Sequence, residues 1–278
     1  MAPVPTPLTH LFLLGRFHLT FDSATVTLSL PAQRLLAHLA IVHRDQRANR
    51  TALAERLWPD ATPVQAVSNL RSVLWRLPRP RGRQLVGTEA TSLHLGAHVE
   101  VDLWQGEELA DDLSAEPRAH HPVLQDLGVV HVLRHDLLPD WHEEWLDIER
   151  ESYRQKRMHA LERYSAHLRE RGRYVEALSA GLRAVQAEPL RESAHRRVIE
   201  VHLAEGNQAE ALREFEAYRQ LLAAELGIEP SDGMLELLGP LLERSRRVPS
   251  AGRGFRMLTR QVGTEPADGT SRRVPPGL

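Results

Sequence analysis

The chain has 278 residues, enough for two ordinary domains, and a hydrophobic fraction of 42% that is typical of a folded protein. It has no cysteine, which excludes disulfides and thiolate metal sites, and no apolar run near the roughly 18 to 20 residues of a membrane helix. Charge is uneven: residues 1–100 carry 11 Arg against 6 acidic residues, 101–244 carry 17 basic against 29 acidic residues, and 245–278 carry 7 Arg against 2. We expect a cytoplasmic protein without a membrane partner. The basic first part is suited to contact a polyanion, and ordinary solubility charge is the alternative explanation of the same imbalance.

The first hundred residues predict a small α/β domain. Alternating apolar residues favour strands over 11–21 and 25–30, with a turn at Asp22–Ala24. A helix begins near Pro31, because proline is tolerated in a helix's first turn. Its apolar positions recur at helical spacing: Leu35, Leu36, Leu39 and Val42. Asn49 is suited to cap a second helix that ends at Trp58, before Pro59.

A third helix is marked by Thr62-Pro63-Val64-Gln65, the pattern of a capping box, and runs to about Leu77. Two short strands over 84–86 and 92–95, separated by residues 87–91, predict a hairpin. Strands, three helices and a hairpin in this order are the layout of a winged helix-turn-helix. We therefore assign residues 1–100 to a winged-helix DNA-binding domain.

The second half predicts helices only. Gly172, Glu176, Ala177 and Leu178 recur 34 residues later as Gly206, Glu210, Ala211 and Leu212. Thirty-four residues is the period of the tetratricopeptide (TPR) repeat. The fold class expected is mainly α: a winged helix-turn-helix followed by an all-α, TPR-like domain over 101–244. The tail, 245–278, is rich in Arg, Gly, Pro and Ser and is expected to be a disordered basic segment.

On a helical wheel, the third helix has one apolar face formed by Val67, Leu70, Leu74 and Leu77. The opposite face is polar. In a major groove, Asn can pair with adenine, Arg with guanine, and Ser with either. The arginines that follow the helix are suited to phosphate contact. The DNA-binding residues predicted here are Ser68, Asn69, Arg71, Ser72 and Arg76 on the helix and Arg79, Arg81 and Arg83 beyond it.

Several of these positions have a structural alternative. Gln65, on the same polar face, is better explained by the capping box than by a base contact. Arg71 can form an ion pair on the helix surface instead of gripping phosphate, and Trp75 can pack against the wing instead of stacking. The arginines after the helix can also be part of a solvated loop.

Three stretches of the first half, GRFHLTFDSATVTLSLPAQRLLAHLAI, RTALAERLWPD and AVSNLRSVLWRL, resemble the OmpR-type winged helix of the antibiotic-regulatory (SARP) activators. Three of the second half, VDLWQGEELADDL, LLPDWHEEWLDIERE and EALREFEAYRQLLAAELGIEP, resemble their bacterial transcriptional activator domain (BTAD). The resemblance covers roughly residues 8–243. It implies a nucleoid-associated activator that binds direct repeats near the −35 region as a dimer on double-stranded DNA. It also implies recruitment of RNA polymerase holoenzyme to specialised-metabolite genes.

Two departures from that family stand out. Family wings commonly carry basic or aromatic residues near the tip, whereas the tip here contains Glu89, which repels phosphate. Larger members append an ATPase, but this chain has no Gly-x-x-x-x-Gly-Lys stretch, and its only lysine, Lys156, follows Gln155. The resemblance therefore implies a short, ATP-independent member.

Two other functions compete with DNA binding as explanations of the sequence. For an enzyme or metal protein, the histidines His120, His121, His131 and His135 lie close in sequence, but no acidic pair joins them, and no nucleophile motif is present. We expect no enzyme, no metal and no cofactor. The stronger rival is a TPR-like protein-interaction adaptor whose winged helix does not bind DNA. Whether a small-molecule effector binds is left open.

Overall fold

The computed structural model describes residues 9–115 and 129–247, and its contacts divide the chain into two units, residues 1–236 and 237–278. The predicted disordered tail, 245–278, lies outside the described residues apart from 245–247, which end the last helix. The helices and strands belong to the first unit, except that the last helix, α10 (Asp232–Arg247), crosses the boundary between the two.

A four-stranded sheet opens the fold. β1 pairs antiparallel with β2 and parallel with β7, so that the strand order is β3-β2-β1-β7. The predicted turn is confirmed, because Asp22 and Ser23 take positive φ and join β2 to β3. A single strand over 11–21 is wrong, since the chain breaks at Gly15 with φ of +89°. The strand expected over 25–30 is also wrong beyond Thr25. The strands are β1 (Thr9–Phe12), β2 (His18–Phe21), β3 (Ala24–Thr25) and β7 (Val99–Val101).

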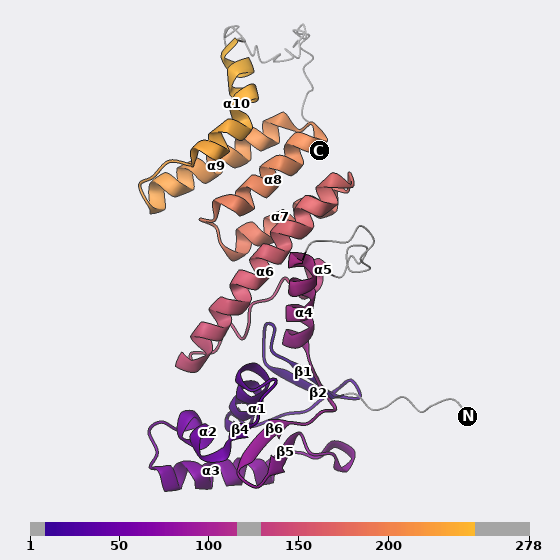
Figure 1. Ribbon diagram of the computed structural model, residues 1–278, viewed down its shortest axis with the longest axis vertical. Helices are drawn as coiled ribbons and strands as arrows, with labels where there is room; N and C mark the ends of the chain where they lie inside the picture. Colours follow the sequence, from indigo (N-terminus) through magenta and orange to yellow (C-terminus); the bar gives the residue numbers. More distant parts are fainter. Residues whose placement is uncertain (1–8, 116–128, 248–278) are drawn as a thin grey trace, which may run out of the picture. The chain divides into compact units, whose positions relative to one another are not determined.

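Three helices and a second sheet complete the winged helix (Figure 1). The second sheet has the strand order β4-β6-β5, and β5 and β6 form the hairpin of the wing. A short 3-10 turn, Pro80–Gly82, lies between α3 and the wing. The elements are α1 (Leu30–Val42), β4 (Ala48–Asn49), α2 (Arg50–Leu57), α3 (Pro63–Arg76), β5 (Val86–Glu89) and β6 (Ser92–Leu95).

Both predicted helix caps are confirmed. The Asn49 side chain accepts hydrogen bonds from the backbone N–H groups of Thr51 and Ala52, at 3.0 and 3.1 Å. At the start of α3, the Gln65 N–H donates to Thr62 Oγ1, and the Thr62 N–H donates to Gln65 Oε1 at 3.1 Å. Because these N–H groups have no partner inside the helix, the two polar side chains decide where each helix begins.

The remaining described elements are helices, which confirms the mainly α fold class. From α6 onward, successive helices pack side by side as far as α9 (Figure 1). Their bounds are α4 (Asp102–Ser114), α5 (Val129–Val132), α6 (Glu144–Glu170), α7 (Tyr174–Ala187), α8 (Glu192–Glu205), α9 (Gln208–Glu225) and α10 (Asp232–Arg247).

The 34-residue repeat has a structural counterpart. Gly172 lies between α6 and α7 with φ of +73°, and Gly206 lies between α8 and α9 with φ of +89°. This left-handed backbone favours glycine because it lacks a Cβ. Ala177 and Ala211, five residues after each glycine, are both fully buried. The repeated residues therefore perform the same two tasks, a tight turn and a close helix contact, in both helix pairs.

One core joins the winged helix to the first helices that follow it. Leu103 of α4 and Leu146 of α6 are buried in the same apolar cluster as the α1 leucines. The Asp102 carboxylate accepts hydrogen bonds from the Leu13 and Leu14 N–H groups, at 2.7 and 3.0 Å. The boundary placed after residue 100 stays a proposal, and the first core extends past it.

Asp102→Ala is expected to lower the free energy of unfolding by about 2–3 kcal/mol. The substitution leaves two partly buried N–H donors without an acceptor. Urea titration followed by circular dichroism measures this. Asp112→Ala, at an exposed position of the same helix, is the control and should stay within about 0.5 kcal/mol of the wild type. Equal stability of the two variants would show that Asp102 does not tie β1 to α4.

Candidate nucleic-acid interface

The buried face of α3 consists of small and aliphatic residues. Ala66 and Leu70 are fully buried, and Val67, Val73 and Leu74 pack against the same core. Among the described elements, α3 packs chiefly on α2 and, less extensively, on α1. The polar face is thus left toward solvent. All five predicted helix residues are exposed: Ser68, Asn69, Arg71, Ser72 and Arg76.

Two polar side chains of this face have partners within α3. The Gln65 amide oxygen is used by the capping box, which agrees with the structural explanation of that residue. The Ser72 hydroxyl donates to the Ser68 carbonyl at 3.0 Å. A hydroxyl can still accept a hydrogen bond while it donates, so Ser72 keeps the capacity to contact a base.

The arginines near α3 differ from those that face the helical half. Within the described residues, no carboxylate lies at ion-pair distance from Arg71, Arg76, Arg79 or Arg83. By contrast, Arg34 of α1 pairs with Glu143 at 2.6 Å. Positive charge is therefore uncompensated along α3 and the loop that follows it.

Arg81 is the exception among the predicted arginines. Its guanidinium forms an ion pair with Asp22 at 2.9 Å and lies 5.7 Å from the ring centroid of Phe21. The residue also has a positive φ of +47°. These contacts attach the loop to the β2–β3 turn, so Arg81 has a structural partner that a phosphate would have to displace.

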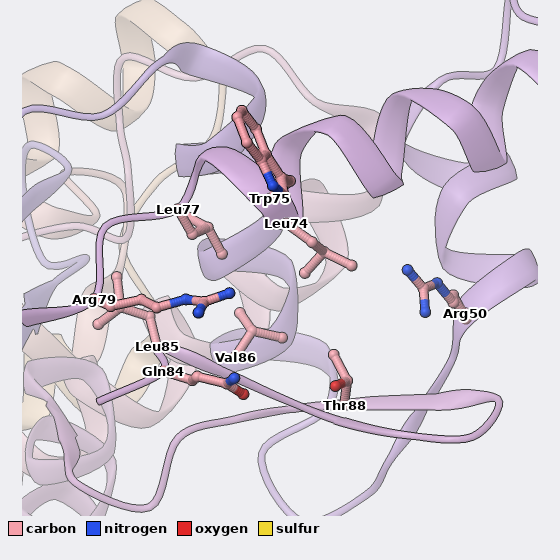
Figure 2. Close-up of a pocket in the computed structure, with 9 residues that line it drawn as sticks. All are labelled: Arg50, Leu74, Trp75, Leu77, Arg79, Gln84, Leu85, Val86 and Thr88. Carbon is pink, nitrogen blue, oxygen red and sulfur yellow. The ribbon is translucent and has the colours of Figure 1, made fainter. Parts of the chain in front are cut away.

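A groove of about 200 Å³ separates α3 from the wing (Figure 2). Figure 2 shows the guanidinium groups of Arg79 and Arg50 pointing into it from its two ends, above the side chains of Gln84 and Thr88. Trp75 borders the groove but is 80% exposed, so the expected packing against the wing does not bury it. Two guanidinium groups and an exposed indole are suited to a sugar-phosphate chain.

The wing tip is shorter than expected. Thr88 pairs with Leu93 and Glu89 with Ser92, so the turn contains only Ala90 and Thr91. Ala90 takes a φ of +39°, which a two-residue hairpin turn demands but alanine does not signal. Glu89 forms an ion pair with Arg47, which offsets the negative charge that set this tip apart from its family.

The candidate metal residues do not converge on one point. Among the described residues, no group of three or more His, Asp or Glu side chains is placed to hold a metal ion. The rings of His131 and His135 lie 6.4 Å apart, and His120 and His121 fall outside the described residues. None of the described helices is long and apolar enough to cross a membrane.

Three neighbours of this surface were not predicted: Arg50, Val64 and Thr88. Arg50 and Thr88 line the groove beside the wing, and Val64 is exposed at the start of α3. Val64 precedes Ser68 by four residues and Arg71 by seven, so helical periodicity could have placed it on the same flank. No local signal placed Arg50 next to the wing, because a contact between the distant residues Arg50 and Thr91 creates that proximity.

Known proteins resemble this chain along most of its length. The family description "Bacterial transcriptional activator domain" matches residues 95–242. Regulatory protein AfsR of Streptomyces coelicolor is 28% identical over 240 residues, covering 83% of this chain and 24% of the relative. Regulatory protein AfsR of Streptomyces griseus is 27% identical over 216 residues, covering 74% of this chain and 22% of the relative. The chain thus spans about a quarter of the length of these relatives.

A solved structure shares the fold. Mycobacterium tuberculosis EmbR, determined in complex with a low-affinity phosphopeptide, superimposes with a TM-score of 0.67 at 19% identity. The match covers 86% of this chain and 66% of that one. An OmpR-type winged helix followed by the matched activator domain is the arrangement expected of the SARP-type regulators. The chain belongs to the bacterial transcriptional activator domain family, and two AfsR regulatory proteins are similar to most of its length.

Proposed function

We propose that this regulator is a sequence-specific activator that inserts α3 into the major groove of double-stranded DNA. The observation that carries the proposal is the exposed polar face of α3, continuous with arginines that have no carboxylate partner. Two protomers would bind direct repeats near a promoter, recruit RNA polymerase holoenzyme and activate specialised-metabolite genes. The protein would act on the nucleoid in the cytoplasm, without an enzymatic activity or a cofactor.

The proposed contacts fall into two chemical groups. Asn69 and Arg76 have amide and guanidinium groups that can bind the edges of adenine and guanine, and Ser68 and Ser72 add short-range hydroxyls. The other arginines bind the phosphate backbone without reading sequence, and Arg81 contributes least because Asp22 holds it. The proposed phosphate-binding residues are Arg71, Arg79, Arg81 and Arg83.

The helical half is proposed as the protein-binding half. Residues 101–244 carry a large excess of acidic residues, which disfavours contact with DNA and suits basic surfaces of the transcription machinery or of a second protomer. On α4, the acidic side chains Glu108, Asp111 and Asp112 are exposed. Of these three residues, only Glu108 forms an ion pair with a residue of the winged helix, Arg44.

An adaptor without DNA-binding activity is the second candidate. Val175 and Leu182, seven residues apart on α7, are exposed apolar side chains that a protein partner could cover. In that case the polar face of α3 would contact protein as well. The two functions differ in how binding responds to salt, since only DNA releases condensed counterions.

Binding to DNA flanking the regulator's own gene is expected to weaken steeply with salt. For about four phosphate contacts per protomer, the affinity should fall by about two orders of magnitude between roughly 50 and 200 mM salt. Fluorescence anisotropy with a labelled fragment measures the slope, and footprinting of the same fragment shows whether two sites lie in direct repeat. If the affinity does not change with salt concentration, or if no fragment is bound, the adaptor function is favoured.

Asn69→Ala and Arg71→Ala should have different effects on DNA binding: the first should reduce sequence specificity, and the second should reduce overall affinity. Losing the Asn69 amide is expected to reduce the ratio of specific to nonspecific affinity by about 5- to 150-fold, corresponding to roughly 1–3 kcal/mol. Losing Arg71 should weaken both affinities alike and lower the salt slope by about one. Arg213→Ala, an exposed arginine of α9, is the control and should change neither. An unchanged sequence preference in Asn69→Ala would refute the assigned face.

Arg79→Ala is expected to weaken DNA binding more than Arg81→Ala. Arg79 lies free in the groove beside the wing, whereas Arg81 is held by Asp22 and Phe21. Each variant is titrated with the same DNA fragment at two salt concentrations, and its unfolding midpoint is recorded. We expect Arg81→Ala to show the larger loss of stability. The reverse order of DNA affinities would mean that the loop releases Arg81 to bind phosphate.

A further inference from the structure

Val64 has no role in the packing of the protein. Its side chain is 81% exposed, more than any other large apolar side chain in the described residues. It occupies the second position of α3, where the capping box of Thr62 and Gln65 determines the course of the backbone. A single exposed valine is common on protein surfaces, so its meaning depends on the residues that surround it.

The surroundings of Val64 connect it to the proposed DNA-reading face. Val64, Ser68 and Arg71 follow at intervals of four and three residues and so lie on one side of α3. Together they border a surface groove of about 460 Å³. Thr51 of α2 and the apolar residues Pro63 and Val67 complete its lining. The groove is thus apolar at the helix start and polar or positively charged along the next two turns.

The major groove of DNA contains one apolar group that could contact Val64. Among the four bases, only thymine presents a methyl group there, and the other major-groove features are hydrogen-bond donors and acceptors. In helix-turn-helix proteins, the N-terminal residues of the recognition helix reach the base edges. Valine is stiff at χ1 in a helix, so Val64 presents its two methyl groups in one orientation and loses little entropy on contact.

We infer that Val64 recognises the C5-methyl group of a thymine in the operator, beside the bases contacted by Ser68 and the phosphate contacted by Arg71. This inference rests on the proposed DNA-binding function and adds to it a preference for thymine. Val64 excludes water from the methyl group, and the neighbouring polar side chains determine which base pair lies against it. Specificity at this position comes from apolar burial, without a hydrogen bond.

The test removes one methyl group at a time from DNA. Wild-type protein first selects its site from a random duplex pool, and each thymine of the enriched site is then replaced by deoxyuridine, which lacks only the C5-methyl. We expect one thymine of each half-site to be sensitive to this replacement. Replacing one such thymine by deoxyuridine should raise the wild-type Kd about fourfold, which corresponds to about 0.8 kcal/mol for one buried methyl. Val64→Ala should bind thymine and deoxyuridine probes with nearly equal affinity.

Val175→Ala is the matched control, because Val175 of α7 is a valine of similar exposure, at 77%. It should retain the wild-type ratio between the two probes. The inference fails if no thymine-to-deoxyuridine change weakens wild-type binding, or if Val64→Ala keeps the fourfold ratio. It also fails if Val64→Ala only prevents a second protomer from joining, since Val64 would then contact protein. If the pool yields no enriched sequence, the proposed DNA-binding function fails instead.

Discussion

The burial of Ala66 and Leu70 decides what the rest of this surface can do. Successive residues of a helix point about 100° apart, so holding these two side chains in the core sends the polar side chains of α3 outward. The capping box at Thr62 adds a second constraint, because it fixes the residue at which the helix begins. Together, these contacts present Ser68, Asn69 and Val64 on a rigid support, as recognition of base edges requires.

The charges of the winged helix are divided in a way that supports this orientation. Arginines that face the helical half are neutralised by its carboxylates, as Arg34 is by Glu143 and Arg44 by Glu107. The contact between these parts also contains hydrogen bonds, such as the one from the Trp104 indole N–H to the Ala40 carbonyl at 2.8 Å, and buried rings. His38 lies 4.6 Å from Trp145 between ring centroids, and burial lowers its pKa to about 4, so it remains neutral at physiological pH. Positive charge is consequently left over on the opposite side, near α3.

Sequence patterns were reliable wherever a feature depends on neighbours along the chain. The Asn49 cap, the Thr62 capping box and the tasks of Gly172 and Gly206 are each decided within about one helical turn. Predictions failed where distant residues decide. The expected strand over 11–21 is interrupted at Gly15, whose N–H donates to the carbonyl of Asp136. The short wing tip is a local feature that the sequence did not indicate, because strand pairing extends to Glu89 although the turn has no glycine.

The sequence by itself determined the mainly helical class, the family and the polar face of α3, since these follow from local periodicity and from recognisable stretches of chain. The tertiary structure alone decided which residues on and around α3 are free to act. Arg81 is held by Asp22, Arg50 is brought to the wing, and Val64 is left in water. The physical reason is that exposure and ion pairing depend on residues far apart in the chain, which helical periodicity does not record.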